Sequence, residues 1–112
     1  MSPITTHVLD TAQGCPARGV PLTLERRDGD TWTVLASGIT DTDGRVADLL
    51  APGELTVGLY RMTFQTGAYF EAQGVSGFYP YVPVPFHIVE LGQHYHVPLL
   101  LSPFGYSTYR GS

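Results

Sequence analysis

The chain is divided into short apolar segments by closely spaced glycine and proline residues. The segments are rich in valine, leucine, threonine, tyrosine and phenylalanine, and 13 Gly and 9 Pro separate them. Runs of β-branched and aromatic residues between turn formers are typical of strands. The predicted strands are Ile4–Asp10, Pro21–Arg27, Thr31–Ser37, Arg45–Ala47, Val57–Gln65, Val84–Glu90, His94–Ser102 and Tyr106–Arg110. About eight strands suffice for two packed sheets, so the pattern predicts an all-β sandwich.

One segment departs from this pattern. Residues Gly67–Gln73 follow a break in the strand signal and precede Gly74, a residue suited to a helix C-terminus. We therefore expect one short helix of one or two turns. The sequence contains no internal repeat and no interdomain linker, and its length is that of one domain. Residues 1–112 are accordingly predicted to form a single domain.

Alternation within the strands assigns their side chains to two faces, because residues two apart point to the same side of a sheet. In His94–Ser102 the side chains suited to the core are all apolar: Tyr95, Val97, Leu99 and Leu101. The opposite face mixes imidazoles with apolar side chains: His94, His96, Pro98 and Leu100. A solvated monomer has little reason to display such a face. The pattern predicts that this face is an interface.

The charged residues of the chain limit the classes of partner that it can bind. The chain has 6 Lys+Arg against 10 Asp+Glu, so it lacks the basic footprint of a nucleic-acid-binding protein. Charged residues make up only 14% of the chain, against about 25% in typical soluble domains, which favours a surface covered by further copies of the chain. The longest aliphatic run, Leu99–Leu101, is far shorter than the roughly 20 residues of a membrane span. With no secretory-signal pattern near residue 1, we expect a cytoplasmic protein.

Histidine is the residue type in this sequence best suited to acid–base catalysis, because imidazole exchanges protons near neutral pH. His94 and His96 are spaced as two ligands on one strand face, and His7 could supply a third, so a three-histidine metal site is one hypothesis. That spacing is weakly specific, because such a pair at the start of a strand is common by chance, and the ordinary interpretation is interface or surface histidines. His87 is interpreted as structural. The single cysteine, Cys15, lies in a predicted turn without a nucleophile signature.

Arg45 follows the tight turn Asp41-Thr42-Asp43-Gly44. The turn resembles part of a calcium loop, but the glutamate required further along such a loop is missing. A guanidinium held beside this turn could bind an anionic oxygen through paired hydrogen bonds. From the residues alone, the chemistry best supported is hydrolysis or proton transfer by histidine, with Arg45 as electrostatic partner.

Three stretches resemble the transthyretin superfamily. They are Ile4–Thr11 with Gly14-Cys15-Pro16-Ala17, the piece Thr42-Asp43-Gly44-Arg45, and His94–Pro103 followed by Tyr106–Ser112. The final Tyr109-Arg110-Gly111-Ser112 is similar to the transthyretin-related 5-hydroxyisourate hydrolases rather than to the hormone-carrying transthyretins. The resemblance spans almost the whole chain and implies a two-sheet transthyretin-like β-sandwich.

The resemblance also implies an activity. Enzymes of this branch open the six-membered ring of 5-hydroxyisourate with water in urate degradation, giving 2-oxo-4-hydroxy-4-carboxy-5-ureidoimidazoline without a cofactor. It implies that the sites lie in a channel between the two dimers of a homotetramer. The catalytic residues implied are His7, Arg45, His96 and Ser112, and the substrate-binding residues are His7, Arg45, Tyr109, Arg110 and Gly111.

Within this hypothesis one imidazole activates water and the other protonates the leaving nitrogen, and the sequence leaves open which does which. Arg45 would stabilise the oxyanion, and Ser112 would contribute a carboxylate at the end of the printed sequence. Three alternatives remain: a carrier that binds an aromatic ligand without turnover, a metal-dependent hydrolase using His7, His94 and His96, and a purely structural interaction domain. The Pro- and Tyr-rich stretch Phe78–Pro85 could also alter packing or substrate access.

Overall fold

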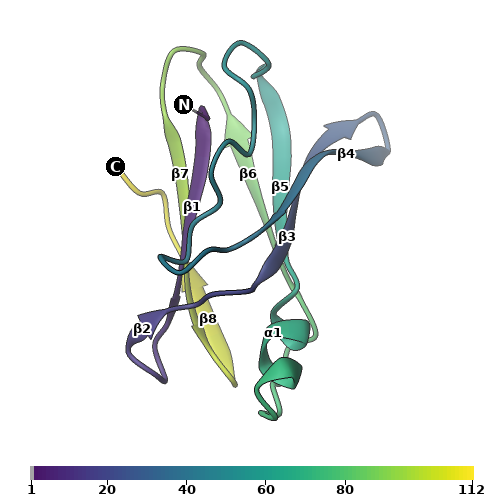
Figure 1. Ribbon diagram of the computed structural model, residues 1–112. Helices are drawn as coiled ribbons and strands as arrows, with labels where there is room; N and C mark the ends of the chain where they lie inside the picture. Colours follow the sequence, from purple (N-terminus) through teal and green to yellow (C-terminus); the bar gives the residue numbers. More distant parts are fainter. Residues whose placement is uncertain (1) are drawn as a thin grey trace.

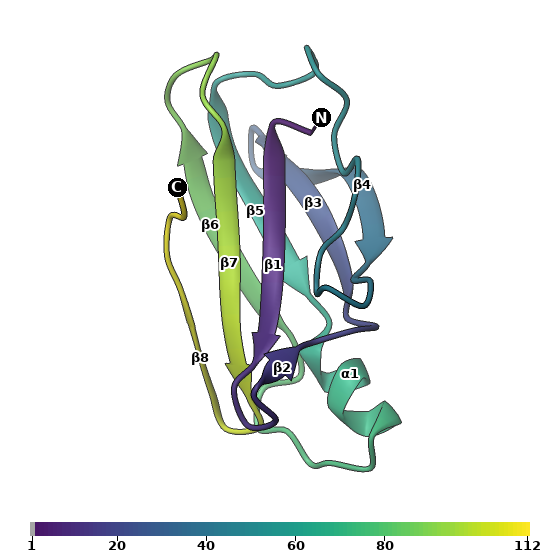
Figure 2. The ribbon, with the colours of Figure 1, turned by 60° about the vertical axis from the view of Figure 1, so that its left-hand side comes forward.

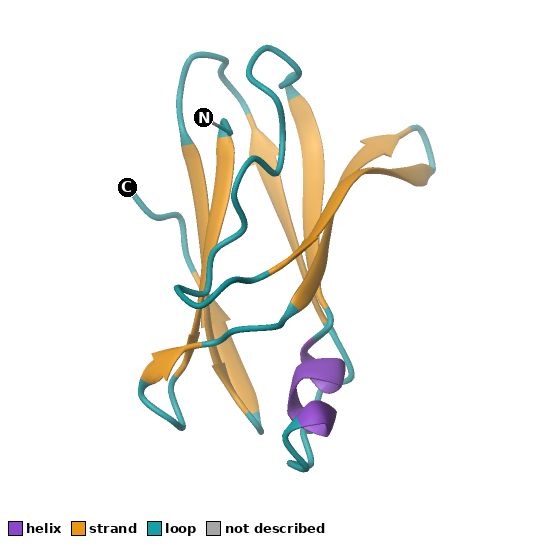
Figure 3. Cartoon of the chain, viewed as in Figure 1, coloured by secondary structure: helices purple, strands orange, loops and turns teal. Residues whose placement is uncertain are grey.

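Two four-stranded sheets pack face to face, with one short helix at one end of the sandwich (Figure 1). The computed structural model describes residues 2–112. The first sheet has the strand order β2 (Cys15–Pro16), β1 (Ile4–Asp10), β7 (Tyr95–Ser102) and β8 (Gly105–Thr108). The second has the order β4 (Thr31–Ile39), β3 (Pro21–Asp28), β5 (Gly58–Phe64) and β6 (Val82–Ile88). Figure 3 shows how strands dominate the chain, as the sequence predicts.

The core lies between the sheets and follows from the alternation of apolar residues. In β7 the predicted core residues Tyr95, Val97, Leu99 and Leu101 are all buried. From the other sheet the largest fully buried side chains on β3 and β5 are Leu22, Leu24, Tyr60, Met62 and Phe64. In β1 every second residue is buried, beginning with Ile4, while Thr5, His7 and Leu9 are half-buried on the outer face. The predicted division of β1 and β7 into two faces is therefore confirmed.

Strands β1 and β7 are parallel neighbours, whereas the other paired strands in the described chain are antiparallel. The register places Thr5 opposite His96, His7 opposite Pro98 and Leu9 opposite Leu100. Because side chains at paired positions share a face, the outward residues of the first and seventh strands form one continuous surface. Figure 2 shows these two strands side by side. The C-terminal segment runs along β7, because β8 pairs with it and Gly111 forms a bridge with His96.

Two predictions about the strands are wrong. Residues 45–47 form no strand: Arg45 makes only an isolated bridge to His7, and the positive φ values of Gly44 and Asp48 turn the backbone away on both sides. The eighth strand is instead β2, two residues that pair with Leu9 and Asp10 and that the sequence predicts as part of a turn. The last strand also ends earlier than predicted, at Thr108, and several other strand ends shift by one or two residues.

The single predicted helix is confirmed as α1 (Thr66–Ala72). It is fixed to the end of β1 by a buried hydrogen bond in which the Tyr69 hydroxyl donates to Asp10 Oδ2 at 2.7 Å. The other carboxylate oxygen of Asp10 accepts the backbone N–H groups of Ala12 and Gln13 at 3.0 Å each. Burial, with the hydrogen bond to Asp10, raises the pKa of Tyr69 to about 12, so the phenol stays protonated and continues to donate. No helix within residues 2–112 has the length and apolarity needed to cross a membrane.

Candidate active site

The connection from β4 to β5, residues 40–57, carries Arg45 across to the first sheet (Figures 1 and 2). It begins at the buried Thr40, whose hydroxyl donates to the Ala17 carbonyl at 2.7 Å and accepts the Val20 N–H at 2.9 Å. Next, the Asp41 carboxylate accepts the backbone N–H groups of Arg45 at 3.1 Å and Asp43 at 2.8 Å. These two contacts, that of Arg45 first, lower the pKa of Asp41. The turn therefore presents Arg45 from a fixed backbone.

His7 and Arg45 are neighbours because the turn docks directly on β1. The Val8 N–H donates to the Gly44 carbonyl at 2.8 Å, and His7 and Arg45 form an antiparallel bridge. Gly44 has a φ of 75°, and a Cβ added there would overlap the Val8 carbonyl oxygen and lie 3.3 Å from His7 Cδ2. Only glycine combines this backbone conformation with so close an approach. Within residues 2–112 the Arg45 guanidinium makes no ion pair, so it is available to an anionic group.

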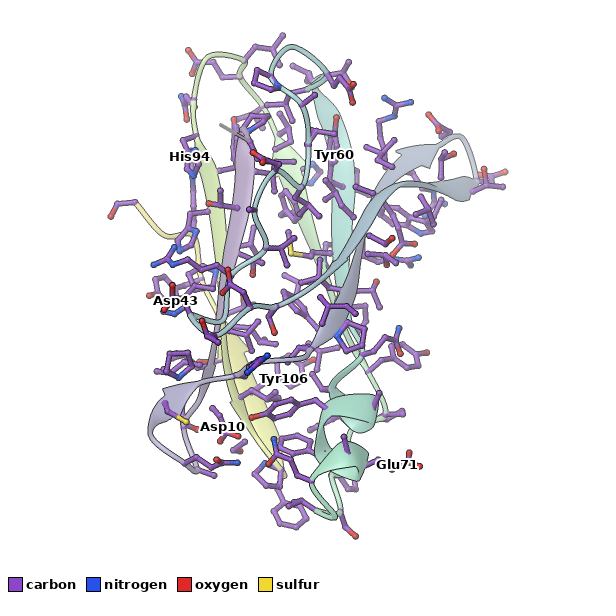
Figure 4. All side chains as sticks on the ribbon, viewed as in Figure 1. Asp10, Asp43, Tyr60, Glu71, His94 and Tyr106 are labelled. Atoms are coloured by element: carbon purple, nitrogen blue, oxygen red, sulfur yellow. The ribbon has the colours of Figure 1, made fainter. Side chains whose placement is uncertain are left out.

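His96 meets β1 through a hydroxyl. Thr5 Oγ1 lies 2.8 Å from His96 Nδ1 and 2.7 Å from His94 Nε2, so one side chain contacts both imidazoles. His96 is half-buried and His94 is exposed just before β7. Figure 4 shows His94 on the outer side of the first sheet, the side that also carries Asp43 of the Arg45 turn.

The pKa of His96 is lowered from its ordinary value, so its imidazole is uncharged at neutral pH. Burial is the main cause, because it penalises the charged form. The positive charge of Arg45 adds to this effect, as do His94 and His7, whereas a backbone contact with Thr5 acts weakly in the opposite direction. A neutral imidazole with one nitrogen held by a hydroxyl can accept a proton at the other nitrogen.

The C-terminal segment folds back over His96. The Gly111 N–H donates to the His96 carbonyl at 2.9 Å, and a Cβ added at Gly111 would overlap the His96 ring at Cδ2. The Arg110 guanidinium donates to Gln93 Oε1 at 2.8 Å and lies 4.6 Å from the centre of the Tyr95 ring. Tyr109 and Ser112 are exposed. The predicted tail therefore reaches His96 through Gly111, while Arg110 is held by the segment that precedes β7.

A single chain leaves these residues on an open face. One cleft of about 340 Å³ lies between β6 and the tail and includes His96, Tyr109, Arg110 and His87 in its wall. A second, of about 370 Å³, is lined by Thr5, Arg45 and the residues around them. Neither cleft contains His7 or holds all the predicted residues. His7, Arg45, His96 and Gly111 are brought together, but neither of these two clefts encloses all four.

The sequence profile of the HIUase/Transthyretin family matches residues 4–111. The chain belongs to this family. It is 49% identical over 109 residues to the 5-hydroxyisourate hydrolase of Salmonella dublin, covering 97% of this chain and 80% of that protein. It is also 50% identical over 116 residues to the 5-hydroxyisourate hydrolase of Caulobacter vibrioides, covering 100% of both.

Solved structures of the HIUase/Transthyretin family superpose on the chain. Sea bream transthyretin in complex with thyroxine gives a TM-score of 0.94 at 36% identity, over 98% of this chain and 95% of that one. The 5-hydroxyisourate hydrolase of Klebsiella pneumoniae gives a TM-score of 0.85 at 38% identity, over 97% of this chain and 98% of that one. The predicted transthyretin-like sandwich is therefore confirmed. Since both an enzyme and a thyroxine-binding protein have this fold, the fold alone does not select the activity.

Two residues that matter in this geometry were not among those predicted for the site. Thr5 shares the outer face of β1 with His7, a relation that alternation shows, but its contact with His96 depends on the pairing of β1 with β7. Gly44 was interpreted only as part of a turn. Within residues 2–112, no group of three or more His, Cys, Asp and Glu side chains is arranged to hold a metal ion, which leaves the three-histidine hypothesis without a preformed site. His87, which was interpreted as structural, is exposed on β6 and lies in the wall of the first cleft.

Proposed function

We propose that this protein hydrolyses 5-hydroxyisourate to 2-oxo-4-hydroxy-4-carboxy-5-ureidoimidazoline in urate degradation, without a metal or organic cofactor. The observation that carries the proposal is the meeting of His7, Arg45 and His96 on one outer face, with Gly111 against His96. The relatives at 49–50% identity are named for this reaction. A carrier needs only a complementary surface, whereas hydrolysis needs a base and an oxyanion partner, and this face supplies both residue types.

In this proposal His96 is the general base, because its lowered pKa keeps the ring uncharged at neutral pH. It removes a proton from water as the water oxygen attacks the ring amide carbonyl. Arg45 stabilises the negative charge that develops on the carbonyl oxygen, an effect worth about 10²–10³-fold in rate when supplied by one donor. His7, beside Arg45, donates a proton to the nitrogen that leaves when the carbon–nitrogen bond breaks.

The C-terminal segment completes the proposed site. Tyr109, Arg110 and Gly111 hold the heterocycle, and Ser112 orients it from the end of the segment. The contact of Gly111 with His96 supports this part, because it fixes the segment over the base. Tyr109 and Arg110 share one cleft with His96, so a ring bound near His96 lies within their reach.

We further propose that the protein is a homotetramer whose sites face the channel between two dimers. Leu9 and Leu100 are paired neighbours on the same outer face as His7 and His96, and they remain partly exposed in one chain. An open apolar face around a candidate site favours completion of that site by a second copy. Residues 2–112 share one core, which supports a single hydrolase domain, and the exposed free Cys15 fits a reducing, cytoplasmic compartment.

The decisive experiment follows the ultraviolet decay of freshly generated 5-hydroxyisourate with and without the protein, before and after treatment with a chelator. Fast decay that resists the chelator supports the proposed hydrolase. An unchanged decay rate contradicts it and favours a carrier of aromatic ligands. Decay that depends on metal favours a site built from His7, His94 and His96.

A further inference from the structure

We infer that Thr5 and His94 form a proton relay with His96, so that the charge acquired by the base leaves the site through β1. The inference rests on the proposed function and adds two residues to it. Thr5 Oγ1 lies within hydrogen-bond distance of both imidazoles, at 2.8 Å from His96 Nδ1 and 2.7 Å from His94 Nε2. Neither Thr5 nor His94 needs to touch substrate, so Thr5 acts as a positioning residue.

The two contacts constrain each other because a threonine hydroxyl has only one proton to donate. If Thr5 donates to His96 Nδ1, then His94 Nε2–H must donate to the hydroxyl oxygen, and Nε2 of His96 carries the proton of that ring. If Thr5 donates to His94 Nε2, then His96 Nδ1–H must donate to Thr5, and Nε2 of His96 has a free lone pair. The first arrangement leaves His96 Nε2 only a hydrogen-bond donor, and the second leaves it free to act as a base.

Catalysis by a base requires the second arrangement. When His96 Nε2 takes a proton from water, the ring carries two N–H groups and a positive charge. The Nδ1 proton then passes to Thr5 Oγ1, and the original hydroxyl proton of Thr5 passes to His94 Nε2. Two N–H bonds form, at His96 Nε2 and His94 Nε2, while the water O–H and the His96 Nδ1–H bonds break. The outcome is a neutral His96 with its proton at Nε2 and a cationic His94.

The surroundings of the two rings give this transfer its direction. His96 is half-buried, with Arg45 of the 40–57 connection and His7 of β1 close enough to disfavour a positive charge. Arg110 of the tail lines the same cleft as His96 and adds a further cation nearby. His94 is exposed, so water solvates its charge. A proton that begins on His96 is therefore more stable on His94.

The test compares Thr5→Val with Thr5→Ser in the full chain. Valine keeps the branched shape but removes the hydroxyl, whereas serine keeps the hydroxyl. We expect kcat of Thr5→Val to fall by about 10²-fold, the lower end of what a general base contributes, with KM within a factor of about two. Thr5→Ser should retain kcat within a factor of about three, and His94→Gln should lower kcat as Thr5→Val does. Wild-type kcat in Thr5→Val would overturn the relay.

A second measurement separates the relay from the proposed function. Nitrogen-15 NMR of the imidazoles across a pH titration should show His94 and His96 titrating as a coupled pair in the wild type and in Thr5→Ser. In Thr5→Val this coupling should weaken to the through-space effect of the His94 charge on His96, which does not need the hydroxyl. If 5-hydroxyisourate is not hydrolysed but the coupling is present, the proposed function fails and the hydrogen-bonded relay stands. Independent titration in the wild type refutes the relay even when hydrolysis is fast.

Discussion

Arg45 combines a free guanidinium with a rigid backbone, and these two properties are tested by one substitution. Arg45→Ala should lower kcat by about 10²–10³-fold, because the proposed mechanism loses its donor to the developing oxyanion. It should also raise the pH at which kcat/KM begins to fall on the acid side. In the wild type, burial and the charge of Arg45 lower the pKa of His96, so its neutral form persists to lower pH than that of an ordinary imidazole. Removing that charge raises this pKa.

The measurement is the pH profile of kcat/KM for the wild type and for Arg45→Ala. Arg18→Ala is the matched control, because Arg18 is also an exposed arginine in a loop but lies outside the candidate site. It should leave both the rate and the acid limb unchanged. An Arg45→Ala protein with the wild-type acid limb would mean that Arg45 does not influence the base.

Gly44 positions Arg45 because it has no Cβ, so the turn before Arg45 can pack closely against β1. Gly44→Ala should destabilise the fold, because the added Cβ meets the Val8 carbonyl in a left-handed backbone conformation. The conformation alone costs on the order of 1–3 kcal/mol. Gly14→Ala separates the two effects, since Gly14 has a φ of 72° but nothing within 4 Å of the added Cβ.

Denaturant unfolding of both variants measures the difference. We expect Gly44→Ala to lose more free energy of unfolding than Gly14→Ala and also to lose activity, because the turn must move off β1. Equal losses for the two variants would show that the close approach to Val8 does not constrain the turn.

At the scale of elements, β3 and β5 are joined on their outer face by a charged pair. Glu25 lies opposite Arg61 in the register and accepts hydrogen bonds from Arg61 and from the Thr63 hydroxyl. The hydrogen bond with Arg61 is the largest cause of the lowered pKa of Glu25, and burial opposes it. A carboxyl whose pKa is lower in the folded protein stabilises the fold above its unfolded pKa of about 4.3. This contribution disappears as pH falls through the folded pKa.

Glu25→Gln should therefore have a lower free energy of unfolding than the wild type at pH 7. This difference in free energy should become smaller at strongly acidic pH. Chemical unfolding at the two pH values measures it, with Glu71→Gln on the exposed side of α1 as the control (Figure 4). A constant gap would show that the charge of Glu25 contributes nothing and that only its shape matters.

The elements also show what a sequence can reveal. The faces of β1 and β7 were predictable because alternation is a local property, and the helix was predictable because Gly74 marks its end. The pairing of Thr5 with His96 was not, because their register joins positions 91 residues apart. The bridge of Arg45 to His7 looked like a strand from composition alone, whereas β2 is too short to give any periodic signal. Local patterns found the candidate residues, and long-range pairing decided which of them touch.

For the whole molecule, the proposed tetramer predicts that activity depends on assembly. Leu100→Asp places a charge on the outer face beside Leu9, where a second copy would bury it. We expect this variant to sediment as a smaller species and to lose activity, while its circular dichroism stays that of a folded sandwich. Val34→Asp is the control, because Val34 is 60% exposed on β4 of the other sheet. A tetrameric, active Leu100→Asp protein would place the interface elsewhere.

The parallel pairing of β1 with β7 also determines when the first sheet can form during translation. The sheet of β3, β4, β5 and β6 emerges from the ribosome as a continuous run of strands, and it can pair while translation continues. Thr5 emerges early but must wait for His96, 91 residues later, on the order of 5–20 s at about 5–20 residues per second. During that interval the β7-facing edge of β1 has no partner and is open to chaperones or to other nascent chains. A chain released before residue 96 therefore contains all four strands of the second sheet but lacks β7 and β8, so it cannot form the histidine cluster.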